Sequence, residues 1–320
     1  MKPTLRRLIF AAISMYICAV SVFAKDLIPV GRVIGLELSA GTVTVAAFED
    51  SLDVGRTSGL QIGDTIVSID AQAIGCAEDV RQALRSSDGT VDMTVLRSGE
   101  KQTIRIQPEI TEDGPKLGIY LKQGITGIGT VTFYDPETKC FGALGHGVSD
   151  NRGALLNLSR GNAYPASIVS VQKGKAGAPG QLKGSLKSSH LLGKLTGNTQ
   201  QGIFGTASTG WEGASIPMAT AEEVRTGDAV IRSTVRDGEP KEYSVKILKI
   251  YPKSRPDGRN LLLEITDPAL LETTGGIIQG MSGSPIIQDG KLVGAVTHVL
   301  VNDPTRGYGI FIENMLDAAG

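Results

Sequence analysis

From residue 117 onward, short runs of alternating apolar and polar residues are separated by glycine-rich turns. Such alternation is typical of half-buried strands, and no long helical pattern separates one run from the next. Closely spaced strands without intervening helices favour a pair of small β-barrels over an α/β sheet. The expected strands are Lys116–Leu121, Ile128–Tyr134, Ala166–Val171, Asp228–Ser233, Tyr243–Ile250, Leu261–Ile265, Ile277–Ile278, Pro285–Gln288, Leu292–Val299 and Gly309–Ile312.

The preceding segment, residues 27–110, has a mixed pattern. Strand-like alternation at Val33–Leu38 and Thr42–Val45 is followed by an amphipathic helix at Glu78–Arg85 and a hairpin at Asp92–Ile106. These elements predict a small α+β domain. The polar, turn-rich run at residues 111–116 is the expected domain boundary. We therefore expect one domain at residues 25–112 and a mostly β domain at residues 113–320.

The N-terminus has the pattern of an export signal. Lys2, Arg6 and Arg7 precede a mostly apolar run, Leu8–Phe23, and small residues precede a cleavage site after Ala24. The apolar run is shorter than the roughly 20 residues that span a bilayer comfortably. We expect residues 1–24 to be a cleaved signal peptide, and an uncleaved membrane anchor is the alternative.

Composition restricts the functional classes. A 320-residue chain with 41% hydrophobic and 20% charged residues is an ordinary globular protein, and its net charge of −1 gives no field to gather nucleic acid. Apart from Cys18 in the leader, Cys76 and Cys140 are the cysteines, and an oxidising compartment would permit a bond between them. No CxxC or HxxxH spacing occurs, so neither a metal site nor a cofactor is expected.

The candidate chemistry centres on a tight turn between two apolar runs, Gly280-Met281-Ser282-Gly283-Ser284-Pro285. Glycines on both sides expose the Ser282 hydroxyl as a nucleophile. The backbone N–H groups of Gly280 and Ser282 are free of side-chain crowding, so together they could hold the oxyanion of a tetrahedral intermediate. Glycine, serine and proline are also ordinary turn residues, and the turn alone leaves both interpretations open.

A serine nucleophile needs an imidazole to accept its proton. His146 is bracketed by Gly145 and Gly147, which lets another segment approach its ring, and it is the expected base. His190 lies in a polar loop and is expected to be solvated. His298 ends the strand after the serine turn, so it could line the same cleft as a supporting or substrate-contacting residue.

The expected third member is a carboxylate that orients the imidazole. Asp267 precedes the serine turn, but Asp-Pro before an apolar run is also the pattern of a helix N-cap, and both roles remain open. Asp150 and Asp228 are weaker alternatives. The order His146, Asp267, Ser282 is that of chymotrypsin-like enzymes. Because Ser284 replaces the last glycine of a G-X-S-X-G elbow, an esterase with the α/β-hydrolase fold is disfavoured.

The run Gly59–Ile69, followed by a helix and a hairpin, resembles the signature of PDZ domains. That resemblance implies that Gly35, Leu36, Glu37 and Leu38 form the loop that receives a peptide C-terminus while the peptide adds as a strand. The alternative for this stretch is a plain β-turn with a core leucine.

Five segments carry further motifs: Gly129–Pro136, Gly142–Gly147, Gly276–Pro285, Gly294–His298 and Val301–Gly309. Together they resemble the stage IV sporulation protein B family of serine peptidases. The resemblance implies a PDZ domain followed by a trypsin-like double barrel, with His146 as base, Asp267 as orienting acid and Ser282 as nucleophile. Met281 stands where zymogens carry an activating aspartate, and Gly276 stands where enzymes selecting Lys or Arg carry an acid.

The resemblance also implies partners and location. Members are exported signalling peptidases that cleave themselves and a membrane-bound regulator, in the space between the spore membranes where the host forms spores. The PDZ domain would bind a ligand peptide and target substrates. The alternative is a binding or scaffold protein whose peptidase-like domain is inactive; an intact motif is necessary but not sufficient for catalysis.

Overall fold

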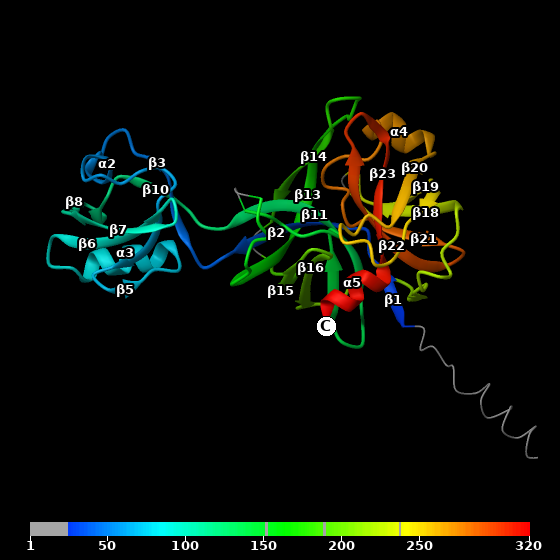
Figure 1. The fold of residues 1–320 in the computed structure, drawn as a ribbon, viewed down its shortest axis with the longest axis horizontal. Helices are drawn as coiled ribbons and strands as arrows, with labels where there is room; N and C mark the ends of the chain where they lie inside the picture. Colours follow the sequence, from blue (N-terminus) through cyan, green and yellow to red (C-terminus); the bar gives the residue numbers. More distant parts are fainter. Residues whose placement is uncertain (1–24, 151–152, 188–189, 237) are drawn as a thin grey trace, which may run out of the picture.

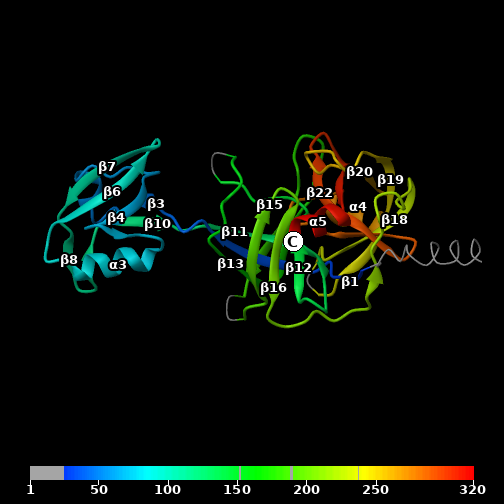
Figure 2. The ribbon, with the colours of Figure 1, turned by 60° about the horizontal axis from the view of Figure 1, so that its bottom comes forward.

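The computed structural model describes residues 25–150, 153–187, 190–236 and 238–320. The expected leader at residues 1–24 lies outside the described residues. Within the described ranges, no helix is both long and apolar enough to cross a membrane. The chain forms a small domain and a larger body built from two β-barrels, and the small domain stands apart from the barrels in both ribbon views (Figure 1 and Figure 2).

The first barrel closes because β12 pairs with both β11 and β16. Around the ring the order is β12, β16, β15, β13, β2 and β11, and every neighbouring pair is antiparallel. The strands are β2 (Val33–Ser39), β11 (Ile125–Tyr134), β12 (Cys140–Ala143), β13 (Arg160–Gln172), β15 (Gly193–Thr199) and β16 (Gly202–Ala207). Beside the ring lie β1 (Asp26–Pro29), β14 (Gln181–Leu186) and β17 (Ile216–Pro217).

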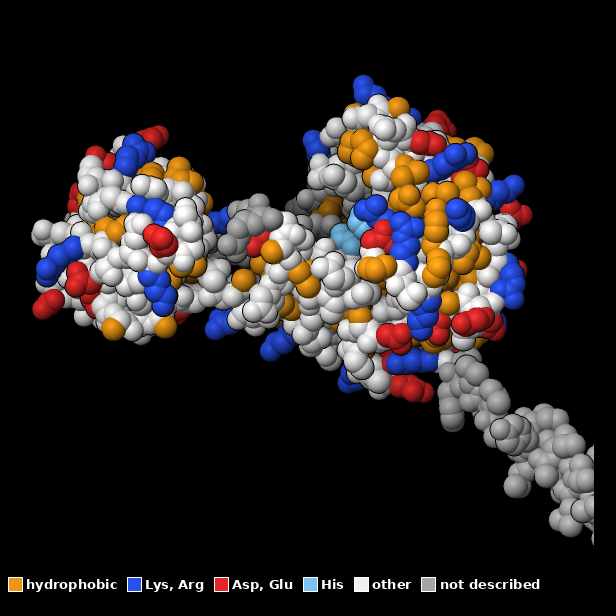
Figure 3. All heavy atoms as spheres, viewed as in Figure 1, with side chains coloured by type: hydrophobic (Ala, Val, Ile, Leu, Met, Phe, Trp, Pro, Cys, Tyr) orange, Lys and Arg blue, Asp and Glu red, His pale blue; other side chains and the backbone are white. Residues whose placement is uncertain are grey.

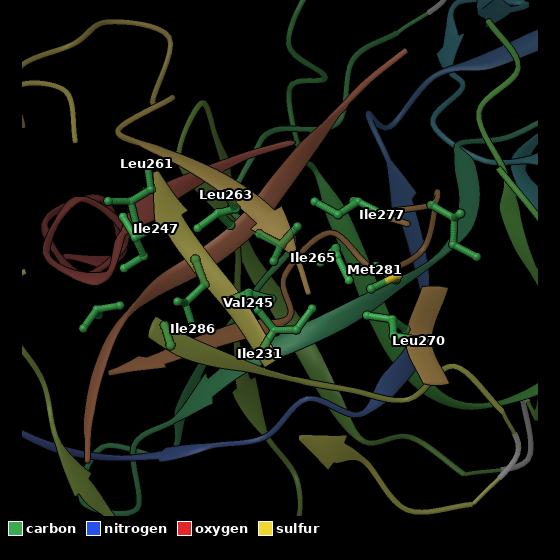
Figure 4. Close-up of a cluster of buried hydrophobic side chains, with 14 of the residues drawn as sticks. Ile231, Val245, Ile247, Leu261, Leu263, Ile265, Leu270, Ile277, Met281 and Ile286 are labelled. Carbon is green, nitrogen blue, oxygen red and sulfur yellow. The ribbon is translucent and has the colours of Figure 1, made fainter. Parts of the chain in front are cut away.

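The second barrel closes in the order β18, β19, β20, β23, β22, β21. Alternation along β20 places Leu261, Leu263 and Ile265 inside, each at most 3% exposed, and the facing strands contribute further aliphatic side chains (Figure 4). Full burial of each such side chain contributes about 1.5–3 kcal/mol. The strands are β18 (Gly227–Ser233), β19 (Lys241–Ile250), β20 (Leu261–Ile265), β21 (Pro285–Gln288), β22 (Lys291–Leu300) and β23 (Asp303–Phe311).

Among the residues described, the helices α4 (Pro268–Thr274) and α5 (Ile312–Ala319) complete the larger body. The helix α4 connects β20 to the serine turn. The helix α5 buries Ile312 and Met315 in a cluster with Phe133 of the first barrel and Leu292 of the second. This helix therefore packs across both barrels and fixes one against the other.

The small domain is a sheet covered by one helix. Its helix α3 (Ala77–Ser86) packs Val80, Ala83 and Leu84 onto the sheet, as the amphipathic pattern predicted. The sheet order is β10, β3, β4, β6, β7, with β5 beside β4. The elements are β3 (Val43–Phe48), α2 (Val54–Thr57), β4 (Thr65–Ile69), β5 (Gln72–Ala73), β6 (Val91–Arg97), β7 (Glu100–Ile106), β8 (Glu109–Thr111), β9 (Gly114–Lys116) and β10 (Ile119–Lys122).

The expected architecture, mostly β with a small α+β domain and a double barrel, is confirmed, but the domain order is corrected. The strands β1 and β2 precede the small domain in sequence and belong to the first barrel. The boundary expected at residues 111–116 is instead the hairpin of β8 and β9, after which β10 returns to pair with β3. The small domain is therefore an insertion between β2 and β11, rather than a domain that precedes the barrels.

The loop predicted to bind a peptide C-terminus is also corrected. Gly35, Leu36, Glu37 and Leu38 lie in the middle of β2, which pairs with β11 on one side and β13 on the other. Their backbone groups are used in those ladders, and a Cβ at Gly35 would lie 2.3 Å from a Leu186 side-chain atom. The stretch is barrel wall, and no peptide can add there as a strand.

Candidate active site

The serine turn lies where the two barrels meet. The Gly283 N–H donates to the Val296 carbonyl of β22 at 2.7 Å, and the Thr130 N–H of β11 donates to the Ser282 carbonyl at 3.1 Å. A Cβ at Gly283 would lie 2.0 Å from the Thr130 carbonyl oxygen, and its φ of +96° is also unfavourable for other residues. Only glycine lets the turn fit between the barrels.

Two threonines of β11 hold the turn from the first barrel. The Thr130 hydroxyl donates to the Gly280 carbonyl and the Thr132 hydroxyl donates to the Gly283 carbonyl, both at 2.8 Å. Both threonines are fully buried. Sequence reasoning gave them no role; the available signal was the Thr-Val-Thr alternation, which places two hydroxyls on one face of a strand.

The candidate oxyanion donors are available. Across the described residues, the amide N–H groups of Gly280 and Ser282 have no hydrogen-bond acceptor. The peptide group that carries each N–H is nevertheless held through its carbonyl oxygen. The Gln279 carbonyl accepts from the Leu182 N–H at 2.8 Å, and the Met281 carbonyl accepts from the Ser284 hydroxyl at 2.7 Å. Each N–H is therefore oriented by its own peptide plane.

The structure shows what surrounds Met281 and Gly276, the two positions at which the sequence lacks the acidic residues of related enzymes. Met281 is fully buried in the core of the second barrel, so the position before the nucleophile carries no charge. Gly276 has φ +134°, and a Cβ there would lie 2.1 Å from the Pro304 carbonyl oxygen. The backbone therefore leaves no room for an acidic side chain at Gly276.

The Ser282 hydroxyl donates to the Thr297 carbonyl of β22 at 2.7 Å. Within the described chain this is its hydrogen-bond acceptor, and no bond joins Ser282 to His146. The hydroxyl must therefore rotate away from Thr297 before an imidazole can take its proton.

His146 follows β12 on a turn in which both Leu144 and Gly145 have φ +68°. A Cβ at Gly145 would lie 2.9 Å from the Thr297 side chain, so this turn packs directly on β22. The imidazoles of His146 and His298 consequently lie with ring centroids 5.2 Å apart and planes tilted by 41°. Histidine side chains are visible on this face of the larger body, beside basic and acidic groups (Figure 3).

The tautomer of His146 follows from its partner. Its Nδ1 lies 3.0 Å from the Gly147 carbonyl oxygen, which can only accept, so Nδ1 carries the proton. The Nε2 lone pair is then available as a base. Burial lowers the pKa of His146 from its ordinary value, and the hydrogen bond to Gly147 opposes this only in part.

His298 lies partly buried beside His146. Burial, followed by electrostatic interaction with His146 and Arg259 that disfavours a second positive charge, lowers the pKa of His298 to about 4. In the described residues its Nδ1 is buried without a hydrogen-bond partner. Both imidazoles are therefore neutral near pH 7, which suits proton acceptance.

Asp267 is the N-cap of α4. Its carboxylate accepts from the Leu270 N–H at 2.9 Å and from the Ser244 N–H at 3.4 Å. Tyr308 of β23 is paired with Leu262 of β20 on one side and with His298 of β22 on the other. Asp267 follows the far end of β20. At the rise of a β-strand, it therefore lies on the order of 15 Å from His298 along the strand direction. Among the described residues no hydrogen bond or ion pair joins it to His146.

The other residues considered from sequence lie elsewhere. Asp228 is exposed, with its carboxylate 3.9 Å from the Lys246 ammonium. Asp150 accepts from the Ala154 N–H, and His190 is exposed. Cys76 and Cys140 are free and belong to the small domain and the first barrel respectively. The structure brings the rings of His146 and His298 together, and it holds the Ser282 hydroxyl on the carbonyl of Thr297, the residue before His298. Among the described residues no cluster of three or more His, Cys, Asp or Glu side chains could hold a metal ion.

Comparison with known proteins defines the class. The family described as SpoIVB peptidase S55 matches residues 113–316, most of the chain. The chain belongs to this family of serine peptidases.

More distant likenesses are partial. A protein of Agrobacterium fabrum, named as a zinc metalloprotease, is 34% identical over 37% of this chain and 30% of its own length. A protein of Pseudomonas fluorescens, named as a periplasmic serine endoprotease similar to DegP, is 28% identical over 40% of this chain and 29% of its own length. The chain thus spans less than a third of each relative.

One solved structure, the inactive form of the Rv3671c protease, is similar over 61% of this chain and 82% of its own chain. It shows 14% identity and a TM-score of 0.33. A likeness at that level supports no conclusion about the site.

Proposed function

We propose that the chain is an exported serine endopeptidase in which Ser282 is the nucleophile, His146 the general base, and the N–H groups of Gly280 and Ser282 the oxyanion donors. The proposal is carried by the serine turn at the meeting of the barrels, where the N–H groups of Gly280 and Ser282 lack an acceptor among the described residues. It is supported by the Ser282 hydroxyl, which bonds to Thr297 next to His298, and by the His146 ring, which lies beside that of His298. Family membership supports the peptidase class.

The proposed reaction begins with rotation of the Ser282 hydroxyl from the Thr297 carbonyl toward Nε2 of His146. As Ser282 Oγ bonds to the substrate carbonyl carbon, its proton passes to Nε2, and the carbonyl electron pair moves to the oxygen facing the two N–H groups. The oxyanion then re-forms the carbonyl as the C–N bond breaks, and Nε2 gives its proton to the leaving amine, so that an acyl-enzyme remains. Water next gives a proton to Nε2 as its oxygen bonds to the acyl carbon; the bond from that carbon to Ser282 Oγ breaks, Oγ takes the proton back from Nε2, and the acid is released.

The resemblance assigns Asp267 as the acid that orients His146. That assignment requires the carboxylate to leave the α4 cap, because both of its described hydrogen bonds lie there. In the described conformation the acceptor at His146 Nδ1 is the Gly147 carbonyl. The base is thus held in a working tautomer without Asp267.

For the small domain we propose a PDZ-type role in peptide binding. The support comes from β10, an edge strand paired only with β3 among the described strands, with a side chain of Tyr120 that is 57% exposed. An edge strand can accept an extended peptide by strand addition. The family resemblance supports the rest of the proposal. We propose that the enzyme cleaves itself and a membrane-associated regulatory protein, and that it acts in spore signalling.

An inactive scaffold is the second candidate, and one observation favours it: the Ser282 hydroxyl bonds to Thr297 rather than to His146. Labelling with a fluorophosphonate separates the two. The proposal expects wild-type protein and the exposed-serine control Ser208→Ala to label, and Ser282→Ala and His146→Ala to lose labelling. Equal labelling of all four proteins, or none of any, would favour the scaffold.

A further inference from the structure

A single peptide group connects His146 to Asn198. The peptide between Gly147 and Val148 offers its carbonyl oxygen to His146 Nδ1 at 3.0 Å, and its N–H donates to the Asn198 side-chain oxygen at 2.9 Å. Because a peptide group is planar and rigid, the direction of its N–H fixes the direction of its carbonyl. The side chain of Asn198 therefore sets where the acceptor of His146 lies.

The remaining hydrogen bonds of Asn198 hold the same loop. Its Nδ2 donates to the Val148 carbonyl at 2.8 Å and to the Leu156 carbonyl at 2.7 Å. One N–H and two carbonyls around the amide allow one orientation only, with Oδ1 toward Val148 N and Nδ2 toward the carbonyls. All three bonds reach backbone atoms of the loop that follows His146.

Packing leaves this peptide little freedom. Asn198 lies near the end of β15, and a Cβ on Gly147 would meet the Thr199 carbonyl oxygen at 2.5 Å. The Val148 carbonyl also accepts from the Leu156 N–H at 2.9 Å. The loop is thus pinned between the strand end and its own return segment, with Asn198 as the side chain that joins them.

We propose that Asn198 is a positioning residue for His146, holding the Gly147–Val148 peptide so that its carbonyl keeps the proton on Nδ1 and leaves Nε2 free for Ser282. The inference rests on the proposed function for its catalytic consequence. An asparagine suits this place because an aspartate would turn two donor contacts into contacts between oxygens. The amide thereby orients, through one peptide bond, the imidazole that a carboxylate orients directly in other triads.

The test follows the proton of His146 and the reactivity of Ser282 separately. The chain has three histidines, so ¹⁵N-histidine spectra at pH 8 should resolve the ring nitrogens of each. In the wild type we expect the His146 proton on Nδ1. In Asn198→Ala we expect the Nε2–H tautomer to become populated and fluorophosphonate labelling of Ser282 to slow about 2- to 10-fold, the range expected for the loss of one hydrogen bond of ordinary strength.

Three further variants make the result specific. Asn198→Asp keeps an acceptor for the Val148 N–H and should retain more of the Nδ1–H tautomer than Asn198→Ala. Asn157→Ala, at an exposed position of the same loop, should change neither readout. If thermal unfolding shows that Asn198→Ala does not fold, Asn198→Ser replaces it with the same expectation.

Unchanged tautomer and unchanged labelling in a folded Asn198→Ala protein would overturn the inference. If the tautomer of His146 shifts in Asn198→Ala but Ser282→Ala is labelled as strongly as the wild type, the positioning role would be upheld and the proposed function overturned. The two failures are therefore distinguishable.

Discussion

The imidazoles of His146 and His298 lie with centroids 5.2 Å apart, and the pKa of each is lowered chiefly by burial. A protonated His298 would place a charge beside a base that must itself become charged during the reaction. The structure keeps both rings neutral until one accepts a proton, and this neutrality has measurable consequences for stability and for rate.

Stability should fall as pH falls between about 6.5 and about 4. An unfolded histidine binds a proton near pH 6.5, whereas folded His298 does so at about 4, so the unfolded state holds more protons between these values. Urea unfolding of wild type and His298→Phe from pH 7.5 to pH 4.5 measures this. The variant should lose stability less steeply over this range; parallel curves would contradict the assignment.

The acid limb of Ser282 reactivity should lie below pH 6.5. Because the pKa of His146 is lowered by burial, its Nε2 remains unprotonated at pH values where an exposed histidine is half charged. The second-order rate of fluorophosphonate labelling between pH 5 and pH 8 tests this. A midpoint at or above pH 6.5 would show that His146 is not the base or is not buried as described.

Asp267 should behave as a helix cap. Asp267→Ala removes the acceptor of the Leu270 N–H and should cost about 1 kcal/mol of stability, whereas Asp267→Asn keeps a good cap and should cost little. Neither change should abolish labelling of Ser282. Loss of labelling in a stably folded Asp267→Asn protein would instead establish the orienting role that the family resemblance implies.

Replacing Thr130 or Thr132 by valine should lower both the stability of the fold and the rate at which Ser282 is labelled. Each threonine-to-valine change leaves a carbonyl of the serine turn without its hydroxyl donor, the partly buried one of Gly280 or the buried one of Gly283, at a cost of about 1–3 kcal/mol. Labelling of Ser282 should slow as the turn loosens. Thr206→Val, at an exposed position of β16, is the matched control. An equal loss of stability and labelling in Thr206→Val would contradict the claim that the β11 hydroxyls hold the serine turn.

The inserted domain should be removable. Leu38 of β2 pairs with Ile125 of β11, so the two ends of the insertion are adjacent and a short hairpin turn can replace residues 40–123. We expect the resulting double barrel to fold and to label at Ser282. A fragment comprising residues 113–320 lacks β1 and β2, which leaves the first barrel open, and it should not fold. The reverse outcome, measured by circular dichroism and labelling, would contradict the topology.

The sequence predicted well those features that depend on residues close together along the chain. Alternation predicted β20, the amphipathic spacing predicted α3, and glycine frames singled out Ser282 and His146. The insertion was missed because the pairing of Val33–Ser39 with β11 joins segments separated by the whole small domain, and no local signal records it. Asn198 was missed for a similar reason, since a single asparagine near a strand end is an ordinary turn residue until its partners are known.

The central claim is that Ser282 forms a covalent acyl-enzyme with the help of His146. Intact-mass and peptide-mapping mass spectrometry of fluorophosphonate-treated protein tests it most directly. We expect one adduct on the peptide that contains Ser282, absent from Ser282→Ala and strongly reduced in His146→Ala. An adduct on another residue, or one whose yield is unaffected by His146→Ala, would contradict the account.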